Sequence, residues 1–255
     1  MALPPRLDPR INGSPLSIKA LWGPRKEDLR ACALRFAALL DGLTALNPIF
    51  KRWTAESRWT MATTRRYPPP QTPGSLAGLI ERGERFQYGD QSIEPQYGYC
   101  ISAESGKENH RTIRVSADVG NYVSTRPDCN YVSLFFVGRS PGNRDLIRPS
   151  FLRQALLVCV ATWRPDWASV ELVHYARRWN TSLHSFPDKQ PWAGWMTYLS
   201  APLAERIVPP ALVASERTPD GGLLMLATRQ QFDVTLPPHV AATDAIQAGL
   251  RPIQR

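Results

Sequence analysis

The 255-residue sequence has few of the residues and patterns from which metal, redox or nucleotide sites are built. It lacks the GxGxxG, GxxxxGK[ST], GxSxG and HExxH motifs of cofactor-binding and hydrolytic sites. Its cysteines are scattered without CxxC spacing, which argues against a structural zinc site. We therefore expect buried, reduced thiols, no cofactor and no bound metal. The four cysteines are Cys32, Cys100, Cys129 and Cys159.

Long apolar runs are absent as well. No stretch of about 18 apolar residues occurs, so we expect no membrane-spanning helix. The first sixteen residues, MALPPRLDPRINGSPL, contain arginine and proline but no apolar core segment, and they do not resemble a signal peptide. We expect a cytoplasmic protein in which residues 1–15 form a loose arm and residues 16–255 form one domain.

The charge balance is basic but diffuse. Lysine and arginine number 31 against 22 acidic residues, which gives a net charge of +9. The basic residues stand mostly alone or in pairs such as Arg65-Arg66 and Arg177-Arg178. A dedicated nucleic-acid-binding protein more often concentrates them in a stripe or tail. We therefore do not expect nucleic acid as the partner, although a binding module built on scattered Arg and Trp stays open as the alternative.

Hydrophobic periodicity predicts an α+β fold, with amphipathic helices packed on a mainly antiparallel sheet. Helices are expected after Pro24 as far as Asn47, over 151–163 and over 237–250, and a short one over 74–82. Strands are expected at 17–22, 97–101, 112–115, 131–136, 170–173, 192–200, 211–213 and 223–227. Residues 219–222, with the sequence Pro-Asp-Gly-Gly, are typical of a hairpin turn between the last two strands.

Histidines offer no local catalytic pattern, and we predict no catalytic residue. A nucleophile pair assembled from distant segments, such as Cys100 or Cys129 with His174 or His184, stays open as a third possibility. Structural roles are the favoured interpretation of the histidines. The four histidines are His110, His174, His184 and His239.

Two aromatic features suggest either packing or binding. Most of the eight tryptophans are expected in the core, because indole rings bury large areas. Trp53, Trp59 and Trp179 lie beside basic residues, and the alternative for them is a base-stacking surface. A separate acidic-aromatic segment is either a solvated loop or a loop that faces a partner. Its side chains are Glu81, Glu84, Phe86, Tyr88, Asp90 and Glu94.

Several segments taken together resemble the bacterial polymorphic-toxin immunity proteins numbered 52. The resembling segments are the Ala-Leu-Trp-Gly-Pro-Arg block at 20–25, the helical region and Trp-Arg-Pro-Asp-Trp-Ala end at 154–168, the Gly-Trp-Met-Thr-Tyr-Leu-Ser block at 194–200, and the region from Gly222 through Pro238-His239-Val240. Their order and spacing cover nearly the whole chain.

The resemblance implies an immunity protein encoded beside a toxin with a restriction-endonuclease-like fold, of a kind often delivered by type VI secretion. It implies no enzymatic activity and no catalytic residues. It also implies structural roles for Gly23-Pro24, at a strand-to-helix turn, and for Gly194, at a close contact. The expected partner is the cognate nuclease toxin, inhibited stoichiometrically, and the expected contact is the acidic-aromatic segment, whose charge suits a basic nuclease groove.

Overall fold

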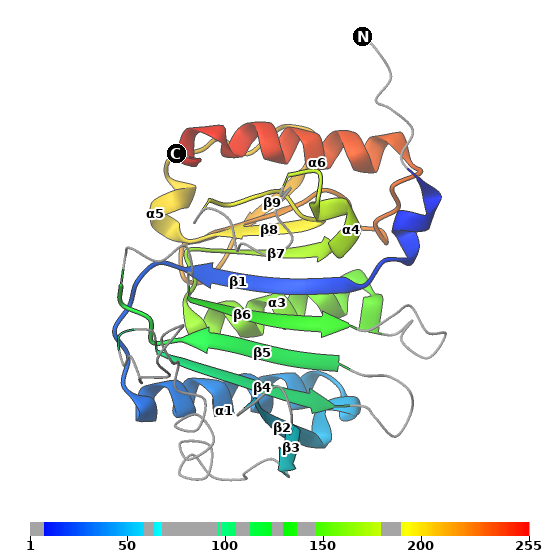
Figure 1. The fold of residues 1–255 in the computed structure, drawn as a ribbon. Helices are drawn as coiled ribbons and strands as arrows, with labels where there is room; N and C mark the ends of the chain where they lie inside the picture. The colour runs from blue at the N-terminus through cyan, green and yellow to red at the C-terminus, as the bar shows by residue number, and fades with distance from the viewer. Residues whose placement is uncertain are drawn as a thin grey trace, which may run out of the picture.

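The computed structural model describes residues 8–58, 64–67, 96, 98–105, 113–123, 130–136, 146–179 and 190–254. Within these residues the chain forms a ten-stranded sheet packed with helices (Figure 1). Every pair of neighbouring strands is antiparallel. The α+β prediction is therefore confirmed. None of the helices in these residues is both long enough and apolar enough to cross a bilayer.

The first strand of the chain lies in the middle of the sheet, because β1 pairs with β6 on one side and with β7 on the other. The sheet order is β3-β2-β4-β5-β6-β1-β7-β8-β10-β9, so β9 is an edge strand. The strands are β1 (Leu16–Trp22), β2 (Trp53–Arg58), β3 (Thr64–Tyr67), β4 (Tyr99–Ser105), β5 (Ile113–Val119), β6 (Asn130–Phe136), β7 (Trp167–Leu172), β8 (Met196–Leu199), β9 (Ala214–Arg217) and β10 (Leu223–Leu226).

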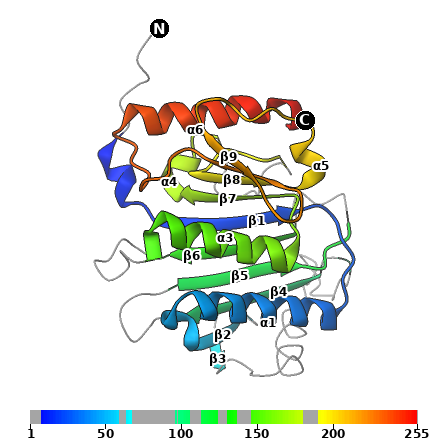
Figure 2. The same ribbon diagram turned by 180° about the vertical axis from the view of Figure 1, so that it is seen from behind.

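Two long helices cover one face of the sheet. Helices α1 and α3 lie behind the strands in Figure 1 and in front of them in Figure 2, whereas α6 runs beside the β8–β9 end. Gly42 of α1 permits close packing on α3, since a Cβ atom there would lie 2.7 Å from Val158 Cγ1. The helices are α1 (Leu29–Leu46), α3 (Pro149–Trp163), α4 (Val173–Ala176), α5 (Ala201–Ala204) and α6 (Pro237–Leu250), with 3-10 turns at Pro9–Gly13, Pro48–Lys51 and Arg251–Ile253.

The core follows from the alternation of side chains along each strand. In β1, Ile18 and Ala20 are fully buried on the helix-covered face, and Trp22 stacks on Trp163 of α3 with ring centroids 5.4 Å apart. The register of the sheet continues this face through Val132 and Leu134 of β6. Apolar residues at three- and four-residue spacing form the face of α1 that meets this core, and all but the partly buried Leu29 are buried. They are Leu29, Cys32, Ala33, Phe36, Leu40 and Leu43.

The opposite face carries a buried ion pair near its centre. Lys19 Nζ lies 2.6 Å from Glu171 Oε1, and the Glu171 side chain is only 1% exposed. Trp192 donates its indole N–H to Glu171 Oε2 at 2.6 Å and stands edge-on to Trp167. Its neighbour Ala193 donates its backbone N–H to Gln247 of α6. Segment 190–195 thus ties α6 to this face, and burial of the carboxylate is compensated by one cation and one indole.

Most of the predicted elements form, but β2 and β3 were not predicted, and β4 and β5 extend beyond their predicted ends to Ser105 and Val119. Three further elements differ in position. Strand β8 begins later than predicted, at Met196, although the backbone of Trp195 still donates to the Val170 carbonyl of β7 and accepts the N–H of Ala227, directly after β10. Residues 211–213 lie in a turn, in which Val213 donates to the Pro210 carbonyl, and the strand begins at Ala214. Strand β7 begins earlier than predicted, at Trp167. The short helix predicted over 74–82 lies outside the described residues.

Part of the predicted N-terminal arm is described, from Asp8 onward. Asp8 caps the 3-10 turn by accepting the backbone N–H of Arg10. The side chain of Asn12 donates to Asp233 and accepts from the backbone N–H of Val234. Residues 8–15 therefore contact the segment that precedes α6.

Candidate functional site

The acidic-aromatic segment predicted to contact a partner lies outside the described residues. This applies to all six of its side chains, Glu81, Glu84, Phe86, Tyr88, Asp90 and Glu94. Its role stays a prediction.

Cys32, Cys159 and His239 are buried and have packing roles. Burial raises the pKa of the Cys32 thiol to about 12, with a further contribution from the nearby Glu27 carboxylate. Burial also raises the pKa of Cys159 to about 12. The His239 ring is buried against Phe232, and its Nδ1 accepts the backbone N–H of Asp233. No group of three or more His, Cys, Asp or Glu side chains suited to a metal ion occurs in the described part of the chain.

Cys129, His110 and His184 lie outside the described residues, so the pairs that include Cys129 or His184 stay predictions. In the remaining pair, Cys100 lies on β4 and His174 on α4, which follows β7, and three strands separate β4 from β7 in the sheet. Cys100 is half-buried in β4, and His174 is half-buried in α4.

Most tryptophans are in the core, as predicted. Six are at most 5% exposed, which removes Trp53 from any base-stacking surface. Trp179 is half-buried, and the Arg178 guanidinium lies 4.8 Å from the centre of its ring. Trp59 lies outside the described residues. The six buried side chains are Trp22, Trp53, Trp163, Trp167, Trp192 and Trp195.

The β9–β10 hairpin forms one end of the sheet. Its turn has the predicted Pro-Asp-Gly-Gly sequence and closes through two backbone bonds, Gly221 N–H to Thr218 O and Thr218 N–H to Gly222 O. Gly221 has φ +82°, so the loop is a type I turn followed by a left-handed residue. Any Cβ at Gly222 would lie 2.5 Å from the ring of Tyr198, so only glycine fits there.

A carboxylate locks this turn onto the sheet. Asp220 accepts hydrogen bonds from Tyr198 Oη at 2.6 Å, from Thr218 Oγ1 and, more weakly, from the Gly222 N–H at 3.3 Å. Burial by itself would raise the pKa of Asp220, but the hydrogen bonds lower it overall. Burial, together with the adjacent carboxylate, raises the pKa of Tyr198, which keeps the phenol a hydrogen-bond donor. The position of β9 is thereby fixed relative to β8.

Strand β9 presents an unpaired edge. Because Thr218 donates to Gly222, alternation along the ladder directs the backbone groups of Glu216 toward β10 and those of Ser215 and Arg217 away from it. Residues 215–217 are exposed, and no described strand pairs with this side of β9. An edge of this kind is a template for pairing with another chain.

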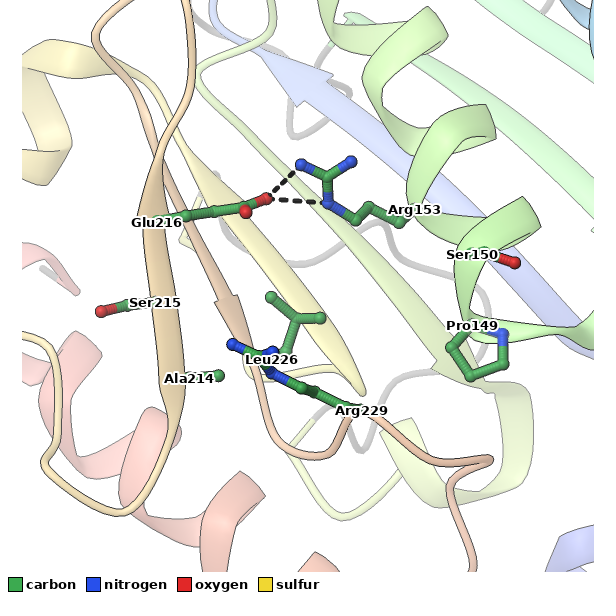
Figure 3. Close-up of a pocket in the computed structure, with 8 residues that line it drawn as sticks. All are labelled: Pro149, Ser150, Arg153, Ala214, Ser215, Glu216, Leu226 and Arg229. Carbon is green, nitrogen blue, oxygen red and sulfur yellow. Dashed lines mark hydrogen bonds and ion pairs between the residues drawn. The ribbon is translucent and has the colours of Figure 1, made fainter.

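A pocket of about 280 Å³ lies beside this edge, between β9 and the first turn of α3 (Figure 3). Arg153 of α3 donates through Nε and Nη2 to one oxygen of Glu216, at 2.8 and 2.5 Å. Arg229 lines the same pocket, and no partner for its side chain occurs among the described residues. Figure 3 shows Ser215 pointing away from the pocket on the other side of β9. Two guanidinium groups and one carboxylate leave the pocket with a net positive charge.

An apolar loop leads into the edge strand. Val208 is 85% exposed and Leu212 is 73% exposed, and both values exceed those of all other large hydrophobic residues in the described ranges. Ile207 is buried before the loop, and Val213 packs against the core after it. The loop is therefore anchored at both ends and holds two apolar side chains in solvent, which is a common feature of interaction surfaces.

Sequence reasoning located the hairpin turn but not this surface. The available signal was an apolar Val-Pro-Pro-Ala-Leu run at 208–212 directly before a hairpin. Periodicity assigned part of that run to a strand interior, and periodicity does not distinguish a buried strand from an exposed apolar turn.

The sequence of this chain is similar to a known protein family over most of its length. The family described as Immunity protein 52 matches residues 17–253. The chain belongs to the Immunity protein 52 family. An immunity role follows from that membership, and the partner that it implies is a toxin protein.

The fold of this family member is shared with a solved structure, the Pseudomonas aeruginosa T6SS protein PA0821. The TM-score is 0.55 at 12% sequence identity, and the match covers 95% of this chain and 74% of that protein. At this identity the similarity concerns the fold alone. None of the curated proteins matches this chain.

Proposed function

We propose that this protein binds a nuclease toxin with a restriction-endonuclease-like fold and blocks it stoichiometrically, protecting the cell that makes both. Membership of the Immunity protein 52 family carries the proposal, since that family match spans residues 17–253. That the toxin is a nuclease is inferred from the sequence resemblance, which extends to TsiT, the immunity partner of a type VI secretion effector in Pseudomonas. A structural neighbour named as a T6SS protein supports the same setting.

The proposed mechanism is binding without bond-making. The chain contributes a preformed surface that either covers the metal-carboxylate site of the nuclease or prevents its active arrangement. A stable complex buries about 1,600 Å² in total and depends on a few well-packed anchors. A nuclease acts on DNA inside the cell, so the proposed place of action is the cytoplasm.

The test is reconstitution with the product of the adjacent gene. We expect the two proteins to elute together, and nuclease activity on plasmid DNA to fall to background at one equivalent of this chain. Separate elution with undiminished cleavage would refute the proposal.

A control must separate specific inhibition of the toxin from non-specific binding of this basic protein to DNA. A protein of net charge +9 can reduce cleavage simply by coating DNA, and such binding weakens steeply with salt. We expect inhibition to persist at 300 mM salt, and an unrelated basic protein of equal charge not to inhibit. Inhibition that vanishes with salt, together with DNA binding by the chain alone, would favour the nucleic-acid-binding alternative.

A further inference from the structure

We infer that the cognate toxin adds an extended segment to the outer edge of β9, places an acidic side chain beside Arg229 and packs apolar side chains on Val208 and Leu212. This inference rests on the proposed function, because it names the surface through which a toxin partner is held. The occupant is a segment of the toxin, and the three parts of the surface each select one of its features.

The backbone of β9 selects an extended strand. Ser215 and Arg217 direct their N–H and C=O groups away from β10, which offers two donors and two acceptors along one edge. Peptides that add a strand to a sheet use such main-chain groups for affinity and pockets beside the edge for specificity. The Asp220 turn holds the edge in place before the partner arrives, so little ordering is needed on binding.

The pocket selects a negative charge. Arg153 is already engaged with Glu216, whereas the Arg229 guanidinium has no partner among the described residues and can donate hydrogen bonds to a carboxylate. Alternate side chains of an added strand point to the pocket side of the sheet. An acidic residue of the toxin at such a position meets Arg229, and a basic residue there meets a site of like charge.

The adjoining loop selects apolar contact. Val208 and Leu212 lie within seven residues of the strand edge and are held in solvent by the buried Ile207 and the packed Val213. Glu216, Arg217 and Pro209-Pro210 limit indiscriminate pairing at this edge, as charge and proline commonly do. Here the flanking loop exposes two aliphatic side chains, which favours a partner that covers them.

Three variants test the parts separately, each with a matched control. Ser215→Pro removes an outward N–H, and Ser215→Ala retains it. Arg229→Glu reverses the free charge, and Arg30→Glu makes the same change on the exposed side of α1. Val208→Asp with Leu212→Asp disrupts the apolar loop, and Leu34→Asp alters an exposed leucine of α1.

Affinity for the purified toxin is the main measurement. We expect each test variant to bind at least about 30-fold more weakly than wild type, as for hot-spot residues, and each control to bind within about threefold. Unchanged melting temperatures verify that the variants are folded.

Amide hydrogen exchange tests the strand without any substitution. In the free protein the outward amides of Ser215 and Arg217 should exchange quickly, and in the complex they should slow by at least about tenfold. Exchange that stays fast in a complex that forms would overturn the inference, as would test variants that bind normally.

Three further outcomes are distinguishable. If wild type binds no neighbouring toxin, the proposed function fails along with the inference. If wild type binds and neutralises the toxin while all three test variants do so equally well, only the inference fails. Sedimentation of the free protein as a dimer that Ser215→Pro dissociates would make a second copy the occupant of this edge and would also overturn it.

Discussion

Replacing Asp220 with alanine should destabilise the protein by about 2 kcal/mol, because it removes the acceptor that holds the β9–β10 turn. The carboxylate accepts hydrogen bonds from Tyr198, Thr218 and Gly222. Tyr198 is 1% exposed, so its hydroxyl loses a partner in a place with little access to water, which costs about 1–3 kcal/mol. Asp220 itself is exposed, so water replaces part of what the other two bonds contribute.

Urea unfolding of four proteins, wild type, Asp220→Ala, Tyr198→Phe and the double variant, measures this directly. We expect a coupling free energy between the two side chains of about 1 kcal/mol or more, as for residues in one hydrogen-bond network. A loss below about 0.5 kcal/mol for Asp220→Ala, the range of ordinary surface substitutions, would refute the reasoning. So would a coupling free energy of zero.

The same interaction predicts a dependence on pH. Hydrogen bonds hold the pKa of Asp220 below its ordinary value of 3.8 in the folded protein, in spite of burial. The stabilisation is therefore fully present above the unfolded pKa and is lost as the pH falls through the lower folded pKa. The difference in unfolding free energy between wild type and Asp220→Asn should be constant from pH 5 to 7 and should shrink below pH 4. An increase on acidification would contradict the assignment.

Three further predictions concern the core. Glu171→Leu should lower the free energy of unfolding by about 3 kcal/mol in urea titrations, since Lys19 loses its buried partner, and the double variant with Lys19→Met should recover part of that loss. A double variant no more stable than the single one would contradict this. Gly194→Ala should cost more than about 1 kcal/mol, because a Cβ there would lie 2.4 Å from a β7 carbonyl oxygen, and an unchanged melting temperature would disprove the contact. Burial raises the pKa values of Cys32 and Cys159 to about 12, so both thiols should resist thiol reagents at pH 7 until guanidinium unfolds the protein. Rapid labelling of all four cysteines in the native state would contradict this prediction.

The sequence by itself determined the fold class and most of the secondary structure, although it did not predict β2 and β3. Apolar residues at three- and four-residue spacing identified α1, α3 and α6, and the Pro-Asp-Gly-Gly turn identified the β9–β10 hairpin. These signals are local, because helix amphipathicity and turn conformation depend on residues only a few positions apart. The family resemblance likewise required only the order and spacing of short segments.

Only the tertiary structure determines which residues form the candidate surface at the edge of β9. Arg153 and Glu216 are separated by 63 residues, and nothing local indicates that they meet, or that Arg229 lies beside them with no partner in the described part of the chain. The same holds for Lys19 and Glu171, which one strand pairing brings together. An apolar run such as 208–212 has the same composition whether it is buried or exposed. Only the sheet order, which makes β9 the last strand, decides that its outer side faces solvent.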